Sequence, residues 1–321
     1  MSRKENFLRV LCHEETTGEV PLWELHFHLW DKLGEEHFIS GREYLGLSER
    51  EKKYALEKDA EIIAEWGERL QFSAVSMPDP PWDCIYTLPS KDRLELIRNI
   101  RKRNPDFGIV ASCGAVIAMP SSGDGYEDFC YKLFDEPEEI DQMCEKIFAN
   151  FLENSRRLID AGADAIYTAS DVADNRTPFF TREQQLRWYF PYLKKFAEYL
   201  RSQRIGAILH TDGNIKDLLA DIKASGVDGL QAIDPVAGMD IREVQIFMEN
   251  RVAVCGNLDC GLMLTGKPEQ VYEEARSILE TCKDRPGFIF GNSNAVAIET
   301  PVENYMAMLE AWKKYGKLGV S

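Results

Sequence analysis

Short apolar runs alternate with amphipathic helical stretches along almost the whole chain, and this order restricts the fold more than any other feature. The runs with the length and composition of strands are residues 21–27, 73–77, 108–116, 165–169, 207–210, 229–233, 252–256 and 288–290. The stretches with helical spacing include residues 137–161, 181–204, 215–225, 240–250, 268–283 and 301–315. A repeated strand–helix order forces parallel pairing through right-handed crossovers, and eight such units can close into a barrel. The sequence therefore predicts an α/β fold, a single (β/α)8 TIM-type barrel.

Two similar turns support this arrangement. Residues 161–164 read Ala-Gly-Ala-Asp and residues 225–228 read Ser-Gly-Val-Asp, and each combines a helix end, a glycine cap and the entry to a strand. The composition does not change abruptly along the chain, so we expect one domain over residues 1–321. Irregular insertions are expected in the N-terminal third, at residues 78–82 and 120–126.

Acidic residues outnumber basic ones, with 54 Asp and Glu against 38 Lys and Arg, and the formal net charge is -16. Nucleic acids and anionic membranes are bound by clustered Lys and Arg, so this balance disfavours both as partners. The first residues are polar, and no apolar stretch approaches the roughly 20 residues that a membrane span needs. We therefore expect a protein of the cytoplasm.

The eight cysteines form no Cys-x-x-Cys pair, the spacing typical of structural zinc sites and redox dithiols. Cys113 and Cys255 each end an apolar run beside a glycine. Free cysteine is commonly buried for packing alone, so packing is the favoured interpretation of both.

The most informative segment is Ala-Ile-Leu-His-Thr-Asp-Gly-Asn at residues 207–214. Side chains alternate along a strand, so His210 and Asp212 should project to the same side where this strand ends. In a β/α barrel that end carries the chemistry. The alternative is a histidine held by a strand-end hydrogen bond, with Asp212 as a helix cap.

Polar residues end the other expected strands as well, and they should gather at the same end of the barrel. The catalytic candidates are His210, Asp212 and Asp171, and the substrate-binding candidates are Glu24, His26, Tyr126, Gln231, Asn257 and Asn292. Further strand-end residues are His28, Asp79, Cys113, Asp234, Asp259 and Asn294. Alternation predicts Glu24, His26 and His28 on one side of the first strand. Helix capping is an equal alternative for Asp171, Asp234 and Asp259.

Four motifs together resemble the uroporphyrinogen decarboxylase superfamily. They are His-Thr-Asp-Gly-Asn at 210–214, Gly-Val-Asp-Gly-Leu at 226–230, Gly-Asn-Leu-Asp at 256–259 and Thr-Pro-Val-Glu-Asn-Tyr at 300–305. Within the superfamily, the chain is most similar to the branch related to corrinoid-dependent methyltransferases. The resemblance is specific for the fold and much less so for the reaction.

One departure concerns the substrate. Uroporphyrinogen decarboxylases carry an arginine-rich segment near the N-terminus that holds the acidic side chains of the porphyrinogen, whereas residues 25–30 here read Leu-His-Phe-His-Leu-Trp. A substrate with many carboxylates would meet few fixed cations in a chain of this net charge. Decarboxylation of uroporphyrinogen is therefore the second interpretation.

Another departure concerns zinc. Zinc methyltransferases of the superfamily usually show His-x-Cys after strand five and a further cysteine after strand eight, and the matching positions here are His210, Asp212 and Asn292. Without the two thiolates, the site has harder ligand atoms, and this argues against a zinc ion that activates thiols. Two alternatives remain: zinc held by His210, Asp212 and Glu24, or no metal, with His210 as an acid or base.

The preferred interpretation from this resemblance is a methyltransferase that moves a methyl group from a small methyl ether or amine to a corrinoid. We find no Asp-x-His-x-x-Gly segment of the kind that binds cobalamin, so the corrinoid is expected on a separate partner protein. The aromatics expected at the site are Trp23, Phe27, Trp30, Trp82, Tyr126 and Tyr167, with at most one arginine at its centre.

Three other classes stay open. Decarboxylation of a smaller acid would use Asp171 or Asp212, with Arg42 and Arg176 as the available arginines. Methyl transfer to a folate or a thiol would need a second cofactor pocket. A protein that only binds its ligand is disfavoured by the number of polar strand ends.

Overall fold

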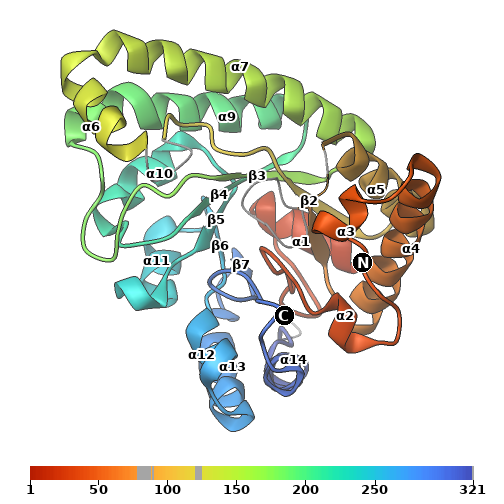
Figure 1. Cartoon of the computed structure of the whole chain (residues 1–321). Helices are drawn as coiled ribbons and strands as arrows, with labels where there is room; N and C mark the ends of the chain where they lie inside the picture. Colours follow the sequence, from red (N-terminus) through yellow and green to blue (C-terminus); the bar gives the residue numbers. More distant parts are fainter. Residues whose placement is uncertain (78–87, 89, 120–124, 320–321) are drawn as a thin grey trace.

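The computed structural model describes residues 1–77, 88, 90–119 and 125–319. Its centre is a curled parallel sheet in which the described strands lie side by side in chain order (Figure 1). The strands are β1 (Ala74–Met77), β2 (Gly108–Ser112), β3 (Ala165–Ala169), β4 (Gly206–Thr211), β5 (Gly229–Ala232), β6 (Ala253–Cys255) and β7 (Phe288–Ile289). The predicted α/β fold with a parallel sheet is confirmed, and each of these strands falls on a predicted run.

The run at residues 21–27 does not form a regular strand, so the described sheet has seven strands and not the eight expected. It lies between β7 and β1 through isolated bridges, from Leu22 to Phe290 and from Trp23 to Ala74. Side-chain hydroxyls take part in the hydrogen bonding at this seam: Ser73 Oγ accepts from the backbone N–H of Leu22, and Ser76 Oγ donates to the carbonyl oxygen of Glu24. Backbone N–H groups of Ser73, Trp23 and Phe290 also donate across this seam, but the pairing stays limited to isolated bridges.

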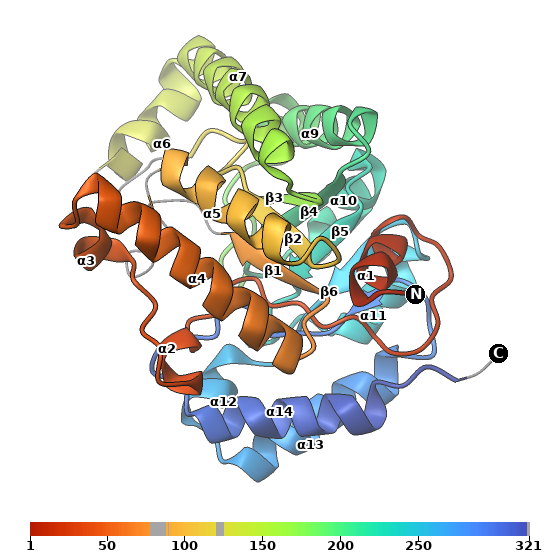
Figure 2. The same ribbon diagram turned by 90° about the vertical axis from the view of Figure 1, so that its right-hand side faces the viewer.

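Helices pack around the sheet. They are α1 (Arg3–Leu11), α2 (Trp30–Leu33), α3 (Gly41–Leu45), α4 (Glu49–Arg69), α5 (Ser90–Arg103), α6 (Tyr126–Asp135), α7 (Pro137–Ala161), α8 (Arg182–Gln184), α9 (Phe190–Ser202), α10 (Leu219–Ser225), α11 (Ile241–Met248), α12 (Cys260–Thr265), α13 (Pro268–Cys282) and α14 (Val302–Tyr315). Short 3₁₀ turns, Lys216–Leu218 and Pro235–Ala237, follow β4 and β5. Figures 1 and 2 show α7 and α9 along one side of the sheet and α13 and α14 along the other.

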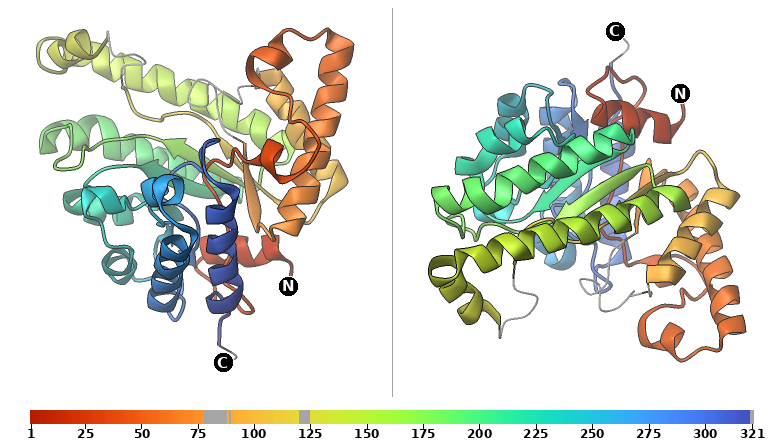
Figure 3. Two further views of the ribbon diagram at one scale, coloured as in Figure 1. Left: turned by 60° about the horizontal axis from the view of Figure 1, so that its bottom comes forward. Right: turned by 90° about the horizontal axis from the view of Figure 1, so that it is seen from above.

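The predicted helices are confirmed in place, and α7 has the predicted bounds. The stretch 181–204 is not one regular helix, because a π-helical turn at Gln185–Tyr189 separates α8 from α9. Pro191 in the first turn of α9 has no N–H to donate to the carbonyl four residues earlier, so the α-helical ladder cannot continue through it. Helix α9 then lies against α7, as the view from above in Figure 3 shows.

The two predicted glycine turns share one structure. Gly162 and Gly226 end α7 and α10 with positive φ angles of 115° and 82°. In each case an aspartate two residues later accepts a hydrogen bond from the backbone of the preceding strand: Asp164 from Ile109 and Asp228 from Ala207. These carboxylates set the start of the strands.

Inside the curl of the sheet lies an apolar cluster, which α1 closes at one end. It contains Val110, Tyr167, Ile208 and Cys255 from the strands, together with Leu11 from α1. A Cβ atom added at Gly206 or Gly229, the first residues of β4 and β5, would meet the side chain of Leu11. Helix α1 therefore covers the amino ends of the strands, and any site inside the curl must open at their carboxyl ends.

Within the described residues, no helix is both long enough and apolar enough to cross a membrane.

Candidate active site

Three side chains that could hold a metal ion or a proton meet at the carboxyl ends of β3 and β4. His210 lies in β4, Asp212 directly follows β4, and Asp171 follows β3. His210 Nε2 is 3.9 Å from Asp171 Oδ1 and 3.9 Å from Asp212 Oδ2. One potential ligand atom from each residue lies within 4.8 Å of the others. The predicted catalytic candidates are thus brought together, and we call Asp171, His210 and Asp212 the acidic triad.

The triad faces solvent on one side. The side chain of His210 is 8% exposed, that of Asp212 31% and that of Asp171 47%. The imidazole is therefore held within the protein, whereas the two carboxylates lie where a small molecule could reach them.

Backbone contacts hold the loops after β3 and β4 together. The N–H of Asp212 donates to Asp171 Oδ1 at 3.0 Å, and the N–H of Asn214 donates to the carbonyl oxygen of Asp174 at 2.7 Å. Gly213 between them has a φ of 87°, and an added Cβ would lie 2.5 Å from the carbonyl oxygen of Ala173. Glycine is needed here for two reasons. A side chain would clash with Ala173, and residues that carry a side chain rarely adopt this positive φ.

His210 is anchored from the other side by Gln231 of β5. His210 Nδ1 lies 2.5 Å from Gln231 Oε1. The Nε2 atom of Gln231 donates to the carbonyl oxygens of Asn292 and Ser293, which follow β7. Gln231 was predicted to bind substrate, but in the structure its side chain is engaged with His210 and the backbone.

The surroundings of Asp212 are strongly acidic. Burial raises its pKa to about 6; the nearby His210 opposes this shift, and the charges of Asp171 and Asp234 add to it. Asn294 Nδ2 donates to Asp212 Oδ2 at 2.5 Å. The site therefore carries an excess of negative charge that favours a cation or a proton.

Glu24 does not join the triad, although it was predicted as a possible zinc ligand with His210 and Asp212. Its buried carboxylate accepts hydrogen bonds from the backbone and side chain of Asn292 and from the hydroxyl of Tyr305 in α14. Burial raises the pKa of Glu24 to about 7, against the effect of these donors. In the structure, Asp171 provides the second carboxylate beside His210.

The expected alternation along residues 24–28 holds only in part: the rings of His26 and His28 are neighbours, with centroids 6.0 Å apart, but Glu24 and His26 are separated. A bend at Leu25 interrupts the extended backbone. His26 Nε2 lies 2.9 Å from the hydroxyl of Tyr167, whose side chain belongs to the cluster inside the curl. Glu24 instead contacts Tyr305 on the outer side of the sheet. His26 and Glu24 therefore have different surroundings.

An aromatic pocket lies beside β1 and is separate from the triad, none of whose residues line it. Its ionisable lining residues are Glu24, His28 and Arg93. Its aromatic lining residues are Phe27, Trp30, Phe38 and Phe72. Burial lowers the pKa of His28 to about 4, so this imidazole is neutral at pH 7. Arg93 lies on α5, a helix that the sequence analysis did not predict, and was missed for that reason.

The remaining candidates are scattered. Tyr126 begins α6 and is 47% exposed, and among the described residues it makes no hydrogen bond to the triad. Asn257 is buried and donates to the carbonyl oxygen of Ile233 at 2.8 Å. Trp23, expected among the aromatics of the site, packs against Phe7 of α1 and so lies toward the amino ends of the strands. Asp79 and Trp82 lie outside the described residues.

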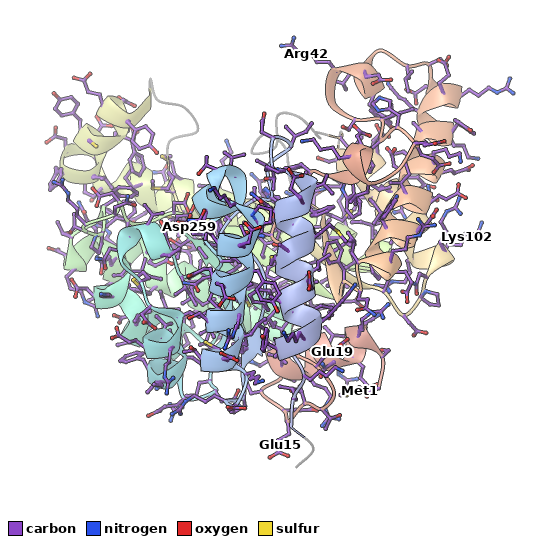
Figure 4. The ribbon with its side chains drawn as sticks, turned by 90° about the horizontal axis from the view of Figure 1, so that it is seen from below. Met1, Glu15, Glu19, Arg42, Lys102 and Asp259 are labelled. Carbon is purple, nitrogen blue, oxygen red and sulfur yellow. The ribbon has the colours of Figure 1, made fainter. Side chains whose placement is uncertain are left out.

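Capping explains two of the three aspartates for which it was an alternative. Asp234 accepts from the N–H of Val236 at 2.9 Å, and Asp259 accepts from the N–H of Gly261 at 2.7 Å at the start of α12. Asp171 instead accepts from Asp212 and belongs to the triad. Figure 4 shows Asp259 by α12, and Arg42 extending outward from α3, away from the body of the protein.

The two cysteines next to glycine are buried, as packing predicts. Burial raises the pKa of the Cys255 thiol strongly, and its side chain belongs to the cluster inside the curl. Cys113 Sγ lies 3.4 Å from the carbonyl oxygen of Tyr167. A buried, protonated thiol such as that of Cys255 is a poor nucleophile and a poor metal ligand.

Comparison with known proteins gives one family. The model of the family described as uroporphyrinogen decarboxylase (URO-D) matches residues 76–315. A uroporphyrinogen decarboxylase from Anaeromyxobacter dehalogenans (strain 2CP-C) is 26% identical over 251 residues, which cover 77% of this chain and 69% of that protein. One from Chloroflexus aggregans (strain MD-66 / DSM 9485) is 25% identical over 244 residues, which cover 74% of this chain and 65% of that protein. Part of each relative thus lies outside the matched region.

Among solved structures, a methyltransferase from Methanosarcina mazei has a similar fold over nearly the whole chain. The TM-score is 0.73 at 17% sequence identity, and the match covers 98% of this chain and 99% of that one.

Proposed function

This chain belongs to the uroporphyrinogen decarboxylase family, and from that premise we propose that it is a methyltransferase. The resemblance seen in its motifs is confirmed for the family. The proposed reaction moves a methyl group from a small methylated substrate, a methyl ether or amine, to a corrinoid carried on a separate protein.

The observation that carries the proposal is the negative charge of the acidic triad and its neighbour Asp234. A substrate with many carboxylates would be repelled by these groups unless arginines offset them. Arg42 is exposed and extends outward, and Arg176 lies on the exposed part of the loop after β3. Arg93 lines the aromatic pocket and not the triad. A neutral methyl ether or a cationic methylamine suits this charge better than a porphyrinogen does.

The donor set of the triad fits zinc. One imidazole nitrogen and two carboxylates, with their ligand atoms within 4.8 Å of one another, supply three ligands of the types that zinc binds, the number that catalytic zinc sites take from the protein. Two carboxylates beside one imidazole suit a divalent cation. When bound, zinc would supply Lewis acidity toward the oxygen or nitrogen that loses the methyl group.

The residues themselves can also serve the reaction. Demethylation is easier when the leaving oxygen or nitrogen is made less basic, by a proton or a Lewis acid. With a pKa of about 6, the carboxyl group of Asp212 can hold a proton near neutral pH, close to Nε2 of His210. The exposed side of the triad is where the substrate would enter.

Decarboxylation is the second candidate, because the relatives from Anaeromyxobacter and Chloroflexus are named uroporphyrinogen decarboxylases. A porphyrinogen with many carboxylates needs positive charge at the site, whereas a small methyl donor does not. The negative charge of the acidic triad therefore supports the small methyl donor.

One experiment separates them. The purified chain would be analysed for metals and then incubated with a reduced corrinoid protein and a panel of methyl ethers and methylamines, while the visible spectrum of the corrinoid is followed. We expect methylation of the corrinoid with at least one compound and no coproporphyrinogen from uroporphyrinogen. Formation of coproporphyrinogen would replace the proposal with the decarboxylase.

A further inference from the structure

The side chain of Gln231 has only one orientation that satisfies its contacts. It is 1% exposed, and its terminal amide lies 3.2 and 3.1 Å from the carbonyl oxygens of Asn292 and Ser293. Carbonyl oxygens only accept hydrogen bonds, so the amide nitrogen must face them. The amide oxygen of Gln231 must then face His210 Nδ1, 2.5 Å away.

This orientation determines where the proton of His210 sits. An amide oxygen has no hydrogen to donate, so Nδ1 must carry the proton of their shared hydrogen bond. A neutral imidazole protonated at Nδ1 has its lone pair on Nε2. That atom is the one 3.9 Å from Asp171 and 3.9 Å from Asp212.

We propose that Gln231 is a positioning residue that keeps the proton of His210 on Nδ1 and thereby directs the Nε2 lone pair into the acidic triad. The inference rests on the proposed role of His210 at the site, but it concerns this chain's own hydrogen bonds and holds with or without a metal. Only a lone pair on Nε2 can bind a cation or accept a proton from the open side of the triad.

The triad itself works against this tautomer. Two carboxylates near Nε2 attract a proton to that nitrogen and would turn the imidazole into a donor toward them. Because Gln231 supplies the only hydrogen-bond acceptor for Nδ1 among the described residues, its removal should let the proton move to Nε2, beside the carboxylates. The expected direction is therefore from Nδ1–H to Nε2–H.

Gln231 is in turn held by a chain of buried groups. It contacts the backbone of Asn292, whose own side chain and N–H donate to the carboxylate of Glu24. The position of the proton on His210 thus depends on Asn292, which follows β7, and on Glu24, which lies beside β1.

The test is nitrogen NMR of the chain with ¹⁵N-labelled histidine. The sequence has five histidines, so the His210→Gln spectrum identifies the signals of His210. Two-bond ¹⁵N–¹H correlations at about pH 8.5, well above the ordinary histidine pKa, report which nitrogen carries the proton. We expect Nδ1–H for His210 in the unaltered chain and a shift to Nε2–H, or a mixture, in Gln231→Met.

Two further variants sharpen the comparison. Gln245 is buried to a similar degree, at 4% exposure, and its Nε2 also donates to backbone carbonyls, so Gln245→Met controls for the loss of a buried amide. It should leave His210 unchanged. Gln231→Glu keeps an acceptor for Nδ1 and should retain Nδ1–H.

Calorimetric titration with zinc gives a second readout. Zinc affinity should fall about 10- to 100-fold in Gln231→Met, the usual scale for loss of a group that orients a metal-binding histidine, and should be unchanged in Gln245→Met. Nε2–H in the unaltered chain, or the same tautomer in Gln231→Met, would overturn the inference. If the unaltered chain binds no zinc, the metal part of the proposed function fails, and the tautomer measurement decides the inference alone.

Discussion

The backbone N–H of Asp212 donates a 3.0 Å hydrogen bond to Oδ1 of Asp171. The residue that directly follows β4 thus positions the carboxylate that follows the neighbouring strand β3. Because His210 precedes Asp212 by two residues, the same bond brings both carboxylates to its Nε2. The parallel pairing of β3 and β4 therefore brings the three residues of the acidic triad together.

Replacement of His210 should abolish most activity and leave the fold intact. The His210→Ala variant loses the one nitrogen base of the triad, and we expect turnover to fall by roughly 100-fold or more, the usual scale for an acid–base group. Turnover with the best methyl donor and the unfolding transition would be measured together. His37→Ala is the control, since the side chain of His37 is 57% exposed. Loss of activity only through unfolding would make His210 a structural residue.

Removal of either carboxylate should weaken zinc binding. Asp171→Asn and Asp212→Asn each remove one negative charge and one carboxylate ligand, so we expect at least a tenfold loss of affinity in calorimetric titration. Asp217→Asn changes the net charge equally at an exposed position in the 3₁₀ turn after β4. An equal effect of all three variants would show that zinc responds to overall charge and not to the triad.

The close approach of the loops after β3 and β4 can be tested at Gly213. Alanine there adopts a positive φ, which costs about 1–2 kcal/mol, and also clashes with Ala173. Gly238→Ala is the control, because Gly238 has a φ of 73° and no atom within 4 Å of an added Cβ. We expect Gly213→Ala to lower the free energy of unfolding in urea by at least about 1 kcal/mol more than Gly238→Ala does. Equal losses would mean that the loops can separate freely.

Most of the sheet could be predicted because buried parallel strands are short apolar runs between helices. The run at 21–27 has the same composition, but the hydroxyls of Ser73 and Ser76 bond to its backbone. An apolar pattern does not contain that information, so a regular eighth strand was predicted where the described chain forms isolated bridges.

The triad could be predicted in part for the same reason. Strand order places Asp171 beside His210 and Asp212, whereas alternation failed for Glu24 because the chain bends at Leu25. The contact between Gln231 and His210 was not predicted, although both residues were named. It depends on amide orientation, which the backbone after β7 determines.

Stability should depend on pH through Glu24. Its pKa in the folded protein is about 7, against an ordinary value of 4.5, and burial is the main cause. Because the folded state binds this proton more tightly than the unfolded state does, the contribution of Glu24 is most favourable below pH 4.5. It falls as the pH rises to about 7 and is constant above that. The difference corresponds to about 3 kcal/mol.

The measurement compares urea unfolding of the unaltered chain and Glu24→Gln at several pH values between 4.5 and 8. Other titrating groups are common to both proteins, so the difference between their free energies of unfolding isolates Glu24. We expect the unaltered chain to lose about 3 kcal/mol relative to Glu24→Gln as the pH rises through this range. Glu274→Gln, at an exposed position of α13, should show no such trend. A constant difference between the unaltered chain and Glu24→Gln would mean that Glu24 is ionised throughout, as an anion stabilised by Asn292 and Tyr305.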